Sequence, residues 1–340
     1  MKKKTPQQPA AAAHIGIDLA KDKFDAALFT AAGAWHHKVF PNTAGGLKSL
    51  GSWLSEHRVS RTTAVMEATG IYWEEVAAWL HARKHTVHVL NPAQARRFAE
   101  SQLCRQKTDA VDAAILCRMA RISTQCEFKA WTPPAAERLA LRRLTRGRES
   151  LVTHRAALQQ QAIECQDKTV SRALRAAAST LTSQISALDC AIARHLEAHP
   201  VLQADAGLLE SIPGIGPVTA AVILAELTPV AGAGVDQCIA YAGLNPRQWQ
   251  SGSSLRSQSR LSKTGNARLR RACYLPALTG WRFNPLLSAF AARLLAHGKK
   301  KMQVVGALMH KLLALACGVL KTRQPFDAHW LSRHTSQSTT

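Results

Sequence analysis

The sequence predicts a mixed α/β domain followed by a longer, mainly α-helical part, and three observations support this fold class. Short apolar segments typical of strands occur near the N-terminus, at 14–20, 24–30, 35–41, 62–68 and 86–90. Segments with the apolar spacing of helices lie among or after them, at 46–57, 71–84 and 108–121. Beyond Pro134 the pattern is helical almost throughout, and only 6% of all residues are aromatic. Strands that alternate with helices indicate a central sheet in the first domain.

The length of 340 residues suits two domains or slightly more. Prolines at 133, 134 and 200 mark breaks in the pattern. We therefore expect a disordered basic tail at 1–13, the α/β domain at 14–132, a helical segment at 133–200, a basic helical domain at 201–331 and a disordered polar tail at 332–340. The first tail differs from a signal peptide because only alanines follow its lysines, and Asp18 comes soon after.

The helical segment carries one continuous apolar stripe. Its members are spaced four, three, four and four residues apart: Leu181, Ile185, Leu188, Ile192 and Leu196. The stripe predicts a helical hairpin or a coiled coil. Packing within its own domain and self-association of the protein both remain open.

The charge balance indicates a polyanionic partner. The chain has 44 Lys and Arg against 22 Asp and Glu, a formal net charge of +22. Nucleic acid is the partner we expect, since cationic side chains replace counterions on phosphates. A membrane surface is the competing polyanion. We find no run of 18 or more apolar residues, and so expect no membrane partner.

The cysteines and histidines do not form a convincing metal site. No Cys-x-x-Cys pair occurs among the eight cysteines, which are Cys104, Cys117, Cys126, Cys165, Cys190, Cys238, Cys273 and Cys317. Their scatter through apolar helical patterns fits reduced thiols and a cytoplasmic protein. The nearest approach to a histidine cluster is His81, His85 and His88, which straddle a helix end and a strand start.

Four acidic residues of the α/β domain are candidates for holding metal. Asp18 lies in the first strand and Glu67 at the end of a later one, and a carboxylate in an apolar strand is costly to bury without a partner. Asp109 and Asp112 share one face of the helix at 108–121. Taken singly, Asp18 could cap a turn and the helix pair could be a solvated face. Together they resemble the Asp-Glu-Asp-Asp set of the RNase H-like fold in RuvC-type nucleases.

Such a set suits two-metal phosphoryl chemistry. Mg²⁺, or Mn²⁺ in its place, prefers oxygen ligands and binds through a few carboxylates plus substrate oxygens. Two ions about 4 Å apart activate the attacking oxygen and stabilise the leaving one. Bound metal would also offset the repulsion among four carboxylates.

The segment Ile212-Pro-Gly-Ile-Gly-Pro217 lies between two amphipathic helical patterns and resembles a helix-hairpin-helix turn. Gly214 and Gly216 would let the backbone approach a phosphate, and the second helix would offer free N–H groups. The alternative is a plain turn between helices, with glycine required for its geometry.

The C-terminal part is strongly basic. No acidic residue occurs between Asp236 and Asp327, and polyphosphate binding explains this best. The candidate phosphate ligands cluster in and after a loop-like polar insert at 245–265: Arg247, Arg256, Arg260, Lys263, Arg268, Arg270 and Arg271.

A serine-rich segment, Ser251-Gly-Ser-Ser254, lies inside this basic stretch. It could bind phosphate, serve as a linker or supply a nucleophile. A serine oxygen that attacks a phosphodiester conserves the bond energy in a phosphoserine link, and nearby arginines would offset charge on the phosphoryl oxygens. No histidine stands beside Ser251 as a local base, so metal held by the acidic domain could lower the pKa of the hydroxyl instead.

Eight segments together resemble one known family, in the family's order over nearly the whole chain. They are Gly16-Ile-Asp18, Glu67-Ala-Thr-Gly70, Asn91-Pro92, Lys107-Thr-Asp109-Ala-Val-Asp112, Ile212-Pro-Gly-Ile-Gly216, Ala242-Gly-Leu-Asn-Pro-Arg247, Ser251-Gly-Ser-Ser254 and Leu261-Ser-Lys-Thr-Gly265. The family is that of bacterial insertion-sequence transposases with an N-terminal DEDD RuvC-like domain and a C-terminal serine transposase domain. Its members are also called bridge recombinases.

The resemblance implies roles for these residues. Asp18, Glu67, Asp109 and Asp112 would be catalytic metal ligands, and Ser251 the nucleophile, with Ser253 and Ser254 as possible substitutes in the loop. The implied partners are donor and target DNA, a bridge non-coding RNA and further copies of the chain, as a dimer or tetramer in a synapse. The implied location is the bacterial cytoplasm, at the nucleoid.

Two other functions stay open on the residues alone. A DEDD nuclease or Holliday-junction resolvase would use the four acids with water as nucleophile, and would not need Ser251. A non-catalytic nucleic-acid-binding protein with a relict acidic site would tolerate loss of Asp18 or Asp112.

Overall fold

The computed structural model describes residues 13–68, 70–103, 108–123, 128–230, 232, 234–247, 250–251, 255–256 and 260–328, with only the backbone at 250, 251, 255 and 256. The chain divides into two compact units between Pro133 and Pro134. The two expected disordered tails lie outside the described residues, except that Ala13 already belongs to the first strand.

The first unit contains a five-stranded mixed sheet, which confirms the predicted α/β domain. The strands are β1 (Ala13–Leu19), β2 (Lys23–Phe29), β3 (Trp35–Pro41), β4 (Thr62–Glu67) and β5 (Thr86–Leu90). Their order is β3-β2-β1-β4-β5. The first three strands pair antiparallel, whereas β4 lies parallel to both β1 and β5. The predicted strands at 14–20, 24–30, 35–41, 62–68 and 86–90 match these within one residue at each end.

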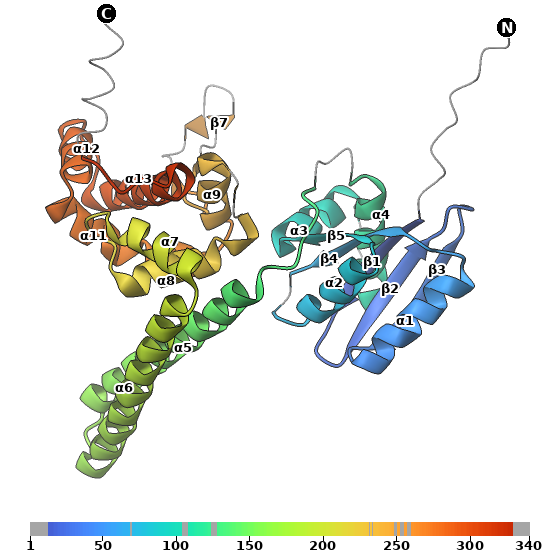
Figure 1. The fold of residues 1–340 in the computed structure, drawn as a ribbon, viewed down its shortest axis with the longest axis horizontal. Helices are drawn as coiled ribbons and strands as arrows, with labels where there is room; N and C mark the ends of the chain where they lie inside the picture. The colour runs from blue at the N-terminus through green and yellow to red at the C-terminus, as the bar shows by residue number, and fades with distance from the viewer. Residues whose placement is uncertain are drawn as a thin grey trace, which may run out of the picture. The chain divides into compact units, whose positions relative to one another are not determined.

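Helices cover both faces of this sheet (Figure 1). The helices are α1 (Ala44–Glu56), α2 (Trp73–Ala82), α3 (Pro92–Ser101) and α4 (Asp109–Arg121). Ile15 and Ile17 of β1 point to one face and form a core with Leu50 of α1 and Leu80 of α2. Residues at alternate positions point to the other face, where Val65 of β4 packs with α4.

Gly16 allows α4 to lie directly on β1. A Cβ atom at this position would come within 2.1 Å of both the Ala113 carbonyl oxygen and the Cys117 nitrogen of α4. These are backbone atoms, which cannot give way as a flexible side chain would. Gly16 therefore sets the distance between the sheet and the helix that carries Asp109 and Asp112.

We predict that Gly16→Ala displaces α4 and destabilises the first unit by about 3 kcal/mol, at the upper end for overpacking a core. Thermal unfolding of the full chain followed by circular dichroism would measure this. Gly45→Ala is the matched control, because only the Thr43 Oγ1 atom comes near a Cβ there, at 3.8 Å. Equal stability of Gly16→Ala and wild type would contradict the close approach.

Helix α3 was not predicted, because Asn91-Pro92 was interpreted only as the end of a strand. The same two residues begin the helix. The Asn91 side chain accepts a hydrogen bond from the Ala93 nitrogen at 2.8 Å, Gln94 completes a capping box, and Pro92 occupies the first turn. The helix buries only Ala95, so it lacks the apolar stripe on which the prediction relied.

The second unit is helical, as predicted. Its elements are α5 (Ala136–Glu164), α6 (Lys168–Glu197), α7 (Pro200–Glu210), α8 (Pro217–Glu226), a 3₁₀ turn at Thr228–Val230, α9 (Val235–Ala242), α10 (Ala267–Ala272), α11 (Tyr274–Phe283), α12 (Pro285–Ala296) and α13 (Lys301–Thr322). Leu141 of α5 and Ile192 of α6 share one core with Leu312 of α13. The segment at 133–200 is thus continuous with the C-terminal helices.

The long helices α5 and α6 form a helical hairpin (Figure 1). Asp167 caps α6 by accepting a hydrogen bond from the Val170 nitrogen at 2.9 Å. The predicted apolar stripe is buried at Ile185, Ile192 and Leu196. Arg148 of α5 forms a paired ion bridge with Asp189 of α6. The stripe is therefore largely used within the chain, and a self-association role is not required to explain it.

Among the helices that the structure describes, one, α13, is long and apolar enough to cross a membrane by length and composition. No such helix was expected. Ten of its residues are buried in the core of the second unit, among them Leu308 and Leu312. Burial in a protein core accounts for its composition. The six described cysteines are free thiols, and Cys104 and Cys126 lie outside the described residues.

Candidate active site

Asp18 and Glu67 lie side by side at the C-terminal ends of two neighbouring strands, β1 and β4. Ile17 of β1 and Met66 of β4 are register partners in a parallel pair, and the two acids come at the next position of each strand. Ile17 and Met66 belong to the core beneath α1 and α2. Because side chains alternate along a strand, Asp18 and Glu67 point to the opposite face, toward α4.

Asp109 and Asp112 stand in the first turn of α4. Thr108 caps this helix through its Oγ1, which accepts from the Val111 nitrogen at 3.3 Å. Carboxylates in a first turn are favoured by the helix dipole. Because α4 packs directly on Gly16, its first turn lies on the face of the sheet to which Asp18 points.

The structure gathers the other three predicted acids around Asp18. Burial and the negative charges of Asp112, Asp109, Glu67 and Asp25, in this order, raise the pKa of Asp18 from 3.8 to about 6. Like charges raise a carboxyl pKa only when they lie close. The arrangement therefore favours any cation that can enter it.

Asp25 is a fifth acid that the sequence interpretation missed. It is the direct partner of Asp18 in the antiparallel pair of β1 and β2, and it is 4% exposed. Its Oδ1 lies 2.9 Å from the Nε2 of His37, and its Oδ2 accepts from the Lys23 Nζ at 3.4 Å. The signal was present, since Asp25 interrupts an apolar strand as Asp18 does.

Lys23 supplies a cation to this acidic cluster. Its Nζ donates to the Asp109 Oδ2 at 2.8 Å as well as to Asp25. The hydrogen bond from Lys23 holds the pKa of Asp109 below its usual range, and the same contact raises the pKa of Lys23. Among the described residues, no three Asp, Glu, His or Cys side chains are already close enough together to ligate a metal. Binding of a metal ion would therefore require these side chains to move closer together.

The turn at 212–217 connects α7 to α8, and its two glycines differ. Gly214 has a φ of +109°, and a Cβ there would come within 2.7 Å of the Pro276 carbonyl oxygen in α11. The protein's own backbone therefore fills the space beside Gly214. Gly216 caps α8, and a Cβ there would meet nothing within 4 Å. Only Gly216 has the open approach that a phosphate contact needs.

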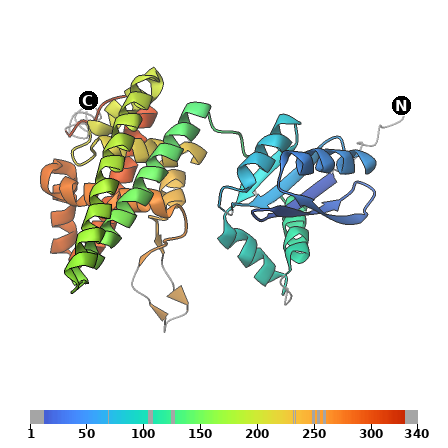
Figure 2. The same cartoon turned by 90° about the horizontal axis from the view of Figure 1, so that it is seen from below.

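The polar insert at 245–265 contains two short antiparallel ladders. Pro246–Arg247 (β6) pairs with Arg260–Leu261 (β9), and Gln250–Ser251 (β7) pairs with Leu255–Arg256 (β8). Figure 2 shows these strands extending from the helices of this unit. Ser251 is thus the last paired residue on its side of the second ladder. Ser253 and Ser254, and the side chains of Ser251 and Arg256, lie outside the described part of the chain.

Comparison with known proteins finds transposase family models that match residues in both units. A family model for DEDD transposases, described as "Transposase", matches residues 15–170, and a second model, "Transposase IS116/IS110/IS902 family", matches residues 206–292. The "Pilin gene-inverting protein" of Moraxella bovis is 33% identical over 330 residues, which cover 92% of this chain and 97% of the relative. The protein of the same name from Moraxella lacunata has the same identity and coverage.

The chain belongs to the IS110 family of transposases. It is therefore a DNA-cutting and rejoining enzyme, and the interpretation as a non-catalytic binding protein does not stand. The "Insertion element IS110 uncharacterized 43.6 kDa protein" of Streptomyces coelicolor is 32% identical over 152 residues, 42% of this chain and 35% of that protein.

Contacts within the protein engage Arg268, Arg270 and Arg271 among the transposase's candidate phosphate ligands. Arg268 pairs with Glu149 of α5, and the Arg271 Nη1 lies 2.6 Å from the Glu149 Oε1. The Arg270 Nη1 donates to the Ala242 carbonyl at 2.9 Å. These contacts fix α10 beside α5 and α9. Arg247, Arg260 and Lys263 are exposed residues.

A buried polar network anchors the base of the insert. Glu226 of α8 is 1% exposed and accepts two hydrogen bonds from Arg146, at 2.7 and 2.9 Å. Asn266 donates to Glu226 at 2.7 Å and to the Tyr241 hydroxyl at 3.2 Å. The Asn266 Oδ1 also caps α10 by accepting from the Arg268 and Leu269 nitrogens. Nothing in the local sequence of Glu226 had indicated this role.

Proposed function

We propose that this transposase cuts and rejoins donor and target DNA through a phosphoserine intermediate on Ser251, with metal assistance from the acidic cluster and guidance by a bridge RNA. The observation that carries the proposal is the gathering of Asp18, Glu67, Asp109 and Asp112 on one face of the sheet, where burial and the neighbouring acids raise the pKa of Asp18 to about 6. The carboxylate donor set fits Mg²⁺ or Mn²⁺. Bound metal would polarise a phosphoryl oxygen and lower the pKa of an attacking hydroxyl.

In the proposed step the Ser251 Oγ forms a bond to phosphorus as the bond from phosphorus to a sugar oxygen breaks. The proton of the serine hydroxyl is taken up by a carboxylate or by water, and the released sugar oxygen gains a proton. Attack by a sugar hydroxyl of another strand reverses the exchange and frees Ser251. No external energy source is needed, because the phosphodiester bond energy is conserved.

Rejoining separates this proposal from the nuclease alternative. The two Moraxella relatives are named for the inversion of a gene, and an inversion needs both cutting and joining. Arg247, Arg260 and Lys263 would hold phosphates beside the serine loop, together with Arg256 and the open backbone at Gly216. Arg268, Arg270 and Arg271 would support the loop through their contacts within the protein.

The family resemblance supplies three further parts of the proposal. These are the bridge RNA, a synaptic dimer or tetramer, and a location at the nucleoid in the bacterial cytoplasm. The acids and Ser251 would act on the same phosphodiester, from one chain or from two. Omitting the RNA is expected to abolish cutting at the element junction. Cutting that is equally fast and accurate without RNA would overturn the guidance.

The serine step is tested by incubating protein, Mg²⁺, RNA and labelled junction DNA, then separating products on a denaturing gel. We predict a covalent protein–DNA band for wild type and none for Ser251→Ala or Asp109→Ala. Ser253→Ala and Ser254→Ala are matched controls and should retain the band. Cleavage without any band that persists in Ser251→Ala would make the enzyme a metal nuclease. A band lost only in a control variant would move the nucleophile to that serine.

Lys23 gives a second test of the acidic cluster. We predict that Lys23→Gln binds Mn²⁺ up to roughly fivefold more tightly than wild type, because the ammonium group no longer competes for Asp109 and Asp25. Titration calorimetry of the full chain would measure the affinity. Lys21→Gln, a change at an exposed neighbouring lysine, is the control. Weaker binding by Lys23→Gln would show that Lys23 supports the metal site.

A further inference from the structure

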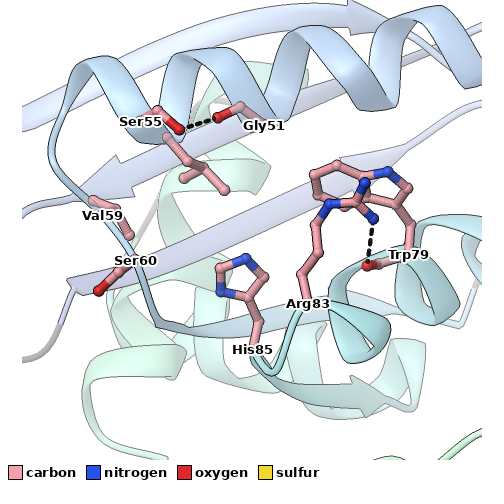
Figure 3. Close-up of a pocket in the computed structure, with 8 residues that line it drawn as sticks. Gly51, Ser55, Val59, Ser60, Trp79, Arg83 and His85 are labelled. Atoms are coloured by element: carbon pink, nitrogen blue, oxygen red, sulfur yellow. Dashed lines mark hydrogen bonds between the residues drawn. The ribbon is translucent and has the colours of Figure 1, made fainter.

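The first unit contains a pocket beside the N-terminal ends of strands β4 and β5. It has a volume of about 440 Å³ and is lined by residues that include Ser55, Val59, Ser60, Trp79, Arg83 and His85 (Figure 3). The loop from α1 to β4 and the loop from α2 to β5 form its rim. Sites for ligands of moderate size span about 300–1,000 Å³, so the volume of the pocket is large enough for one base.

This pocket is distinct from the acidic cluster. Strand β4 runs from Thr62, beside the pocket, to Glu67, within the cluster. Six residues of strand span about 17 Å. A group bound in the pocket is therefore too far from the acids to be the one that is cut.

Arg83 provides a flat surface in the pocket. Its guanidinium lies 3.8 Å from the centroid of the Trp79 ring, and its Nη1 donates to the Trp79 carbonyl at 3.4 Å (Figure 3). The Arg83 side chain is exposed, so the guanidinium has one face on the indole and offers the other to a ligand. Unpaired bases stack on guanidinium planes and aromatic rings in this way.

Gly51 and His85 complete the pocket. A Cβ at Gly51 would come within 3.2 Å of the Trp79 ring, so glycine leaves the room that the ring occupies. The His85 Nδ1 accepts a hydrogen bond from the Thr62 nitrogen at 3.2 Å, so the neutral ring carries its proton on Nε2. The Ser55 hydroxyl donates to the Gly51 carbonyl at 3.0 Å and so offers a base edge an acceptor, while the His85 Nε2 and the Ser60 hydroxyl can donate.

The rim is basic. Its two loops carry Arg58, Arg61, Arg83 and Lys84. Arg58 and Lys84 have φ values of 58° and 65°, in the region where glycine is usual after a helix. Cations there are favoured by the helix dipole, and they add positive charge to the two loops of the rim, where Arg83 itself lines the pocket. Phosphates that flank a base in the pocket would meet this charge.

We propose that this pocket binds one nucleotide of a single-stranded nucleic-acid segment that the enzyme holds but does not cut there. The base stacks on Arg83 and reaches the polar groups of the pocket. The flanking phosphates lie against the basic rim. The segment can belong to RNA or to DNA, because both present the same base faces and phosphates.

The test measures binding of labelled single-stranded RNA and DNA oligonucleotides of one sequence to the full chain in EDTA, by fluorescence anisotropy. Arg83→Gln and Arg83→Lys are both expected to weaken binding roughly tenfold, since lysine restores the charge but not the plane. Arg118→Gln, at an exposed arginine of α4, is the control and should change affinity less than about twofold. An effect on the RNA alone or on the DNA alone identifies the source of the segment.

Recovery of wild-type affinity by Arg83→Lys, or an equal loss in the Arg118→Gln control, would overturn the stacking proposal. Ultraviolet cross-linking followed by mass spectrometry gives a second measurement on unaltered protein. We expect nucleotide adducts on the peptide that contains Trp79. Adducts confined to the second unit would also overturn the proposal. Because no metal is present, neither result depends on the serine chemistry.

Discussion

Asp18→Asn is expected to lower the rate of metal-dependent DNA cleavage by about a hundred- to a thousandfold. A loss of this size is typical when one preorganised group that stabilises a transition state is removed. Asn keeps the shape of the side chain but removes the charge at the centre of the acidic cluster. The measurement is single-turnover cleavage of junction DNA at saturating Mg²⁺. Asp22→Asn, at an exposed acid in the β1–β2 turn, is the control and should retain the rate. Full activity of Asp18→Asn would remove Asp18 from the proposed mechanism.

Although Asp18→Asn lowers activity, the same variant should be more stable than wild type at neutral pH when no metal is bound. The pKa of Asp18 is about 6 in the folded protein and 3.8 as a model value, so the folded state holds the proton more tightly. Wild type should therefore lose stability as pH rises from about 4 to about 6, and Asp18→Asn should not. Since Asp18 is only half-buried, screening reduces the expected difference at pH 7 to about 1 kcal/mol. Denaturant unfolding in EDTA at several pH values would test this, and equal pH profiles would contradict the close packing of the acids.

Glu226→Gln is expected to destabilise the second unit by about 3 kcal/mol, because it leaves the partly buried Arg146 guanidinium without its counter-charge. Urea unfolding of the full chain would measure the loss. Glu149→Gln is the control, since Glu149 is a more exposed partner of two arginines and its loss should cost less than about 1 kcal/mol. Equal effects of the two changes would show that the network around Glu226 has no special role in stability.

The contribution of Glu226 also depends on pH. Burial raises its pKa, but hydrogen bonds from Arg146 and Asn266 outweigh burial and hold the pKa below its usual value of 4.5. The stabilisation is therefore present above about pH 4.5 and is lost as pH falls through the lower folded value. The difference in stability between wild type and Glu226→Gln should shrink in acid. A difference that is independent of pH would point to packing rather than charge.

The sequence by itself determined the five strands of the first unit, three of its four helices and the positions of four of its acids. Strand and helix patterns are local, because side chains alternate along a strand and repeat along a helix. The five strands were therefore predicted within one residue at each end, with Asp18 in the first strand and Glu67 at the end of a later one. The short polar helix α3 was missed because it buries only Ala95 and has no periodic apolar signal.

Only the tertiary structure decided which residues far apart in the sequence form ion pairs, and which backbone segments pack against one another. Asp25 joins Asp18 through strand pairing, and Lys23 reaches Asp109 across 86 positions of sequence. Arg271 finds Glu149 from 122 positions away, and the backbone of α11 closes the space beside Gly214. Such contacts depend on how helices and strands pack, which no local pattern encodes. The residue types fixed the available chemistry, whereas packing determined which side chains remain open to DNA, metal or a second strand.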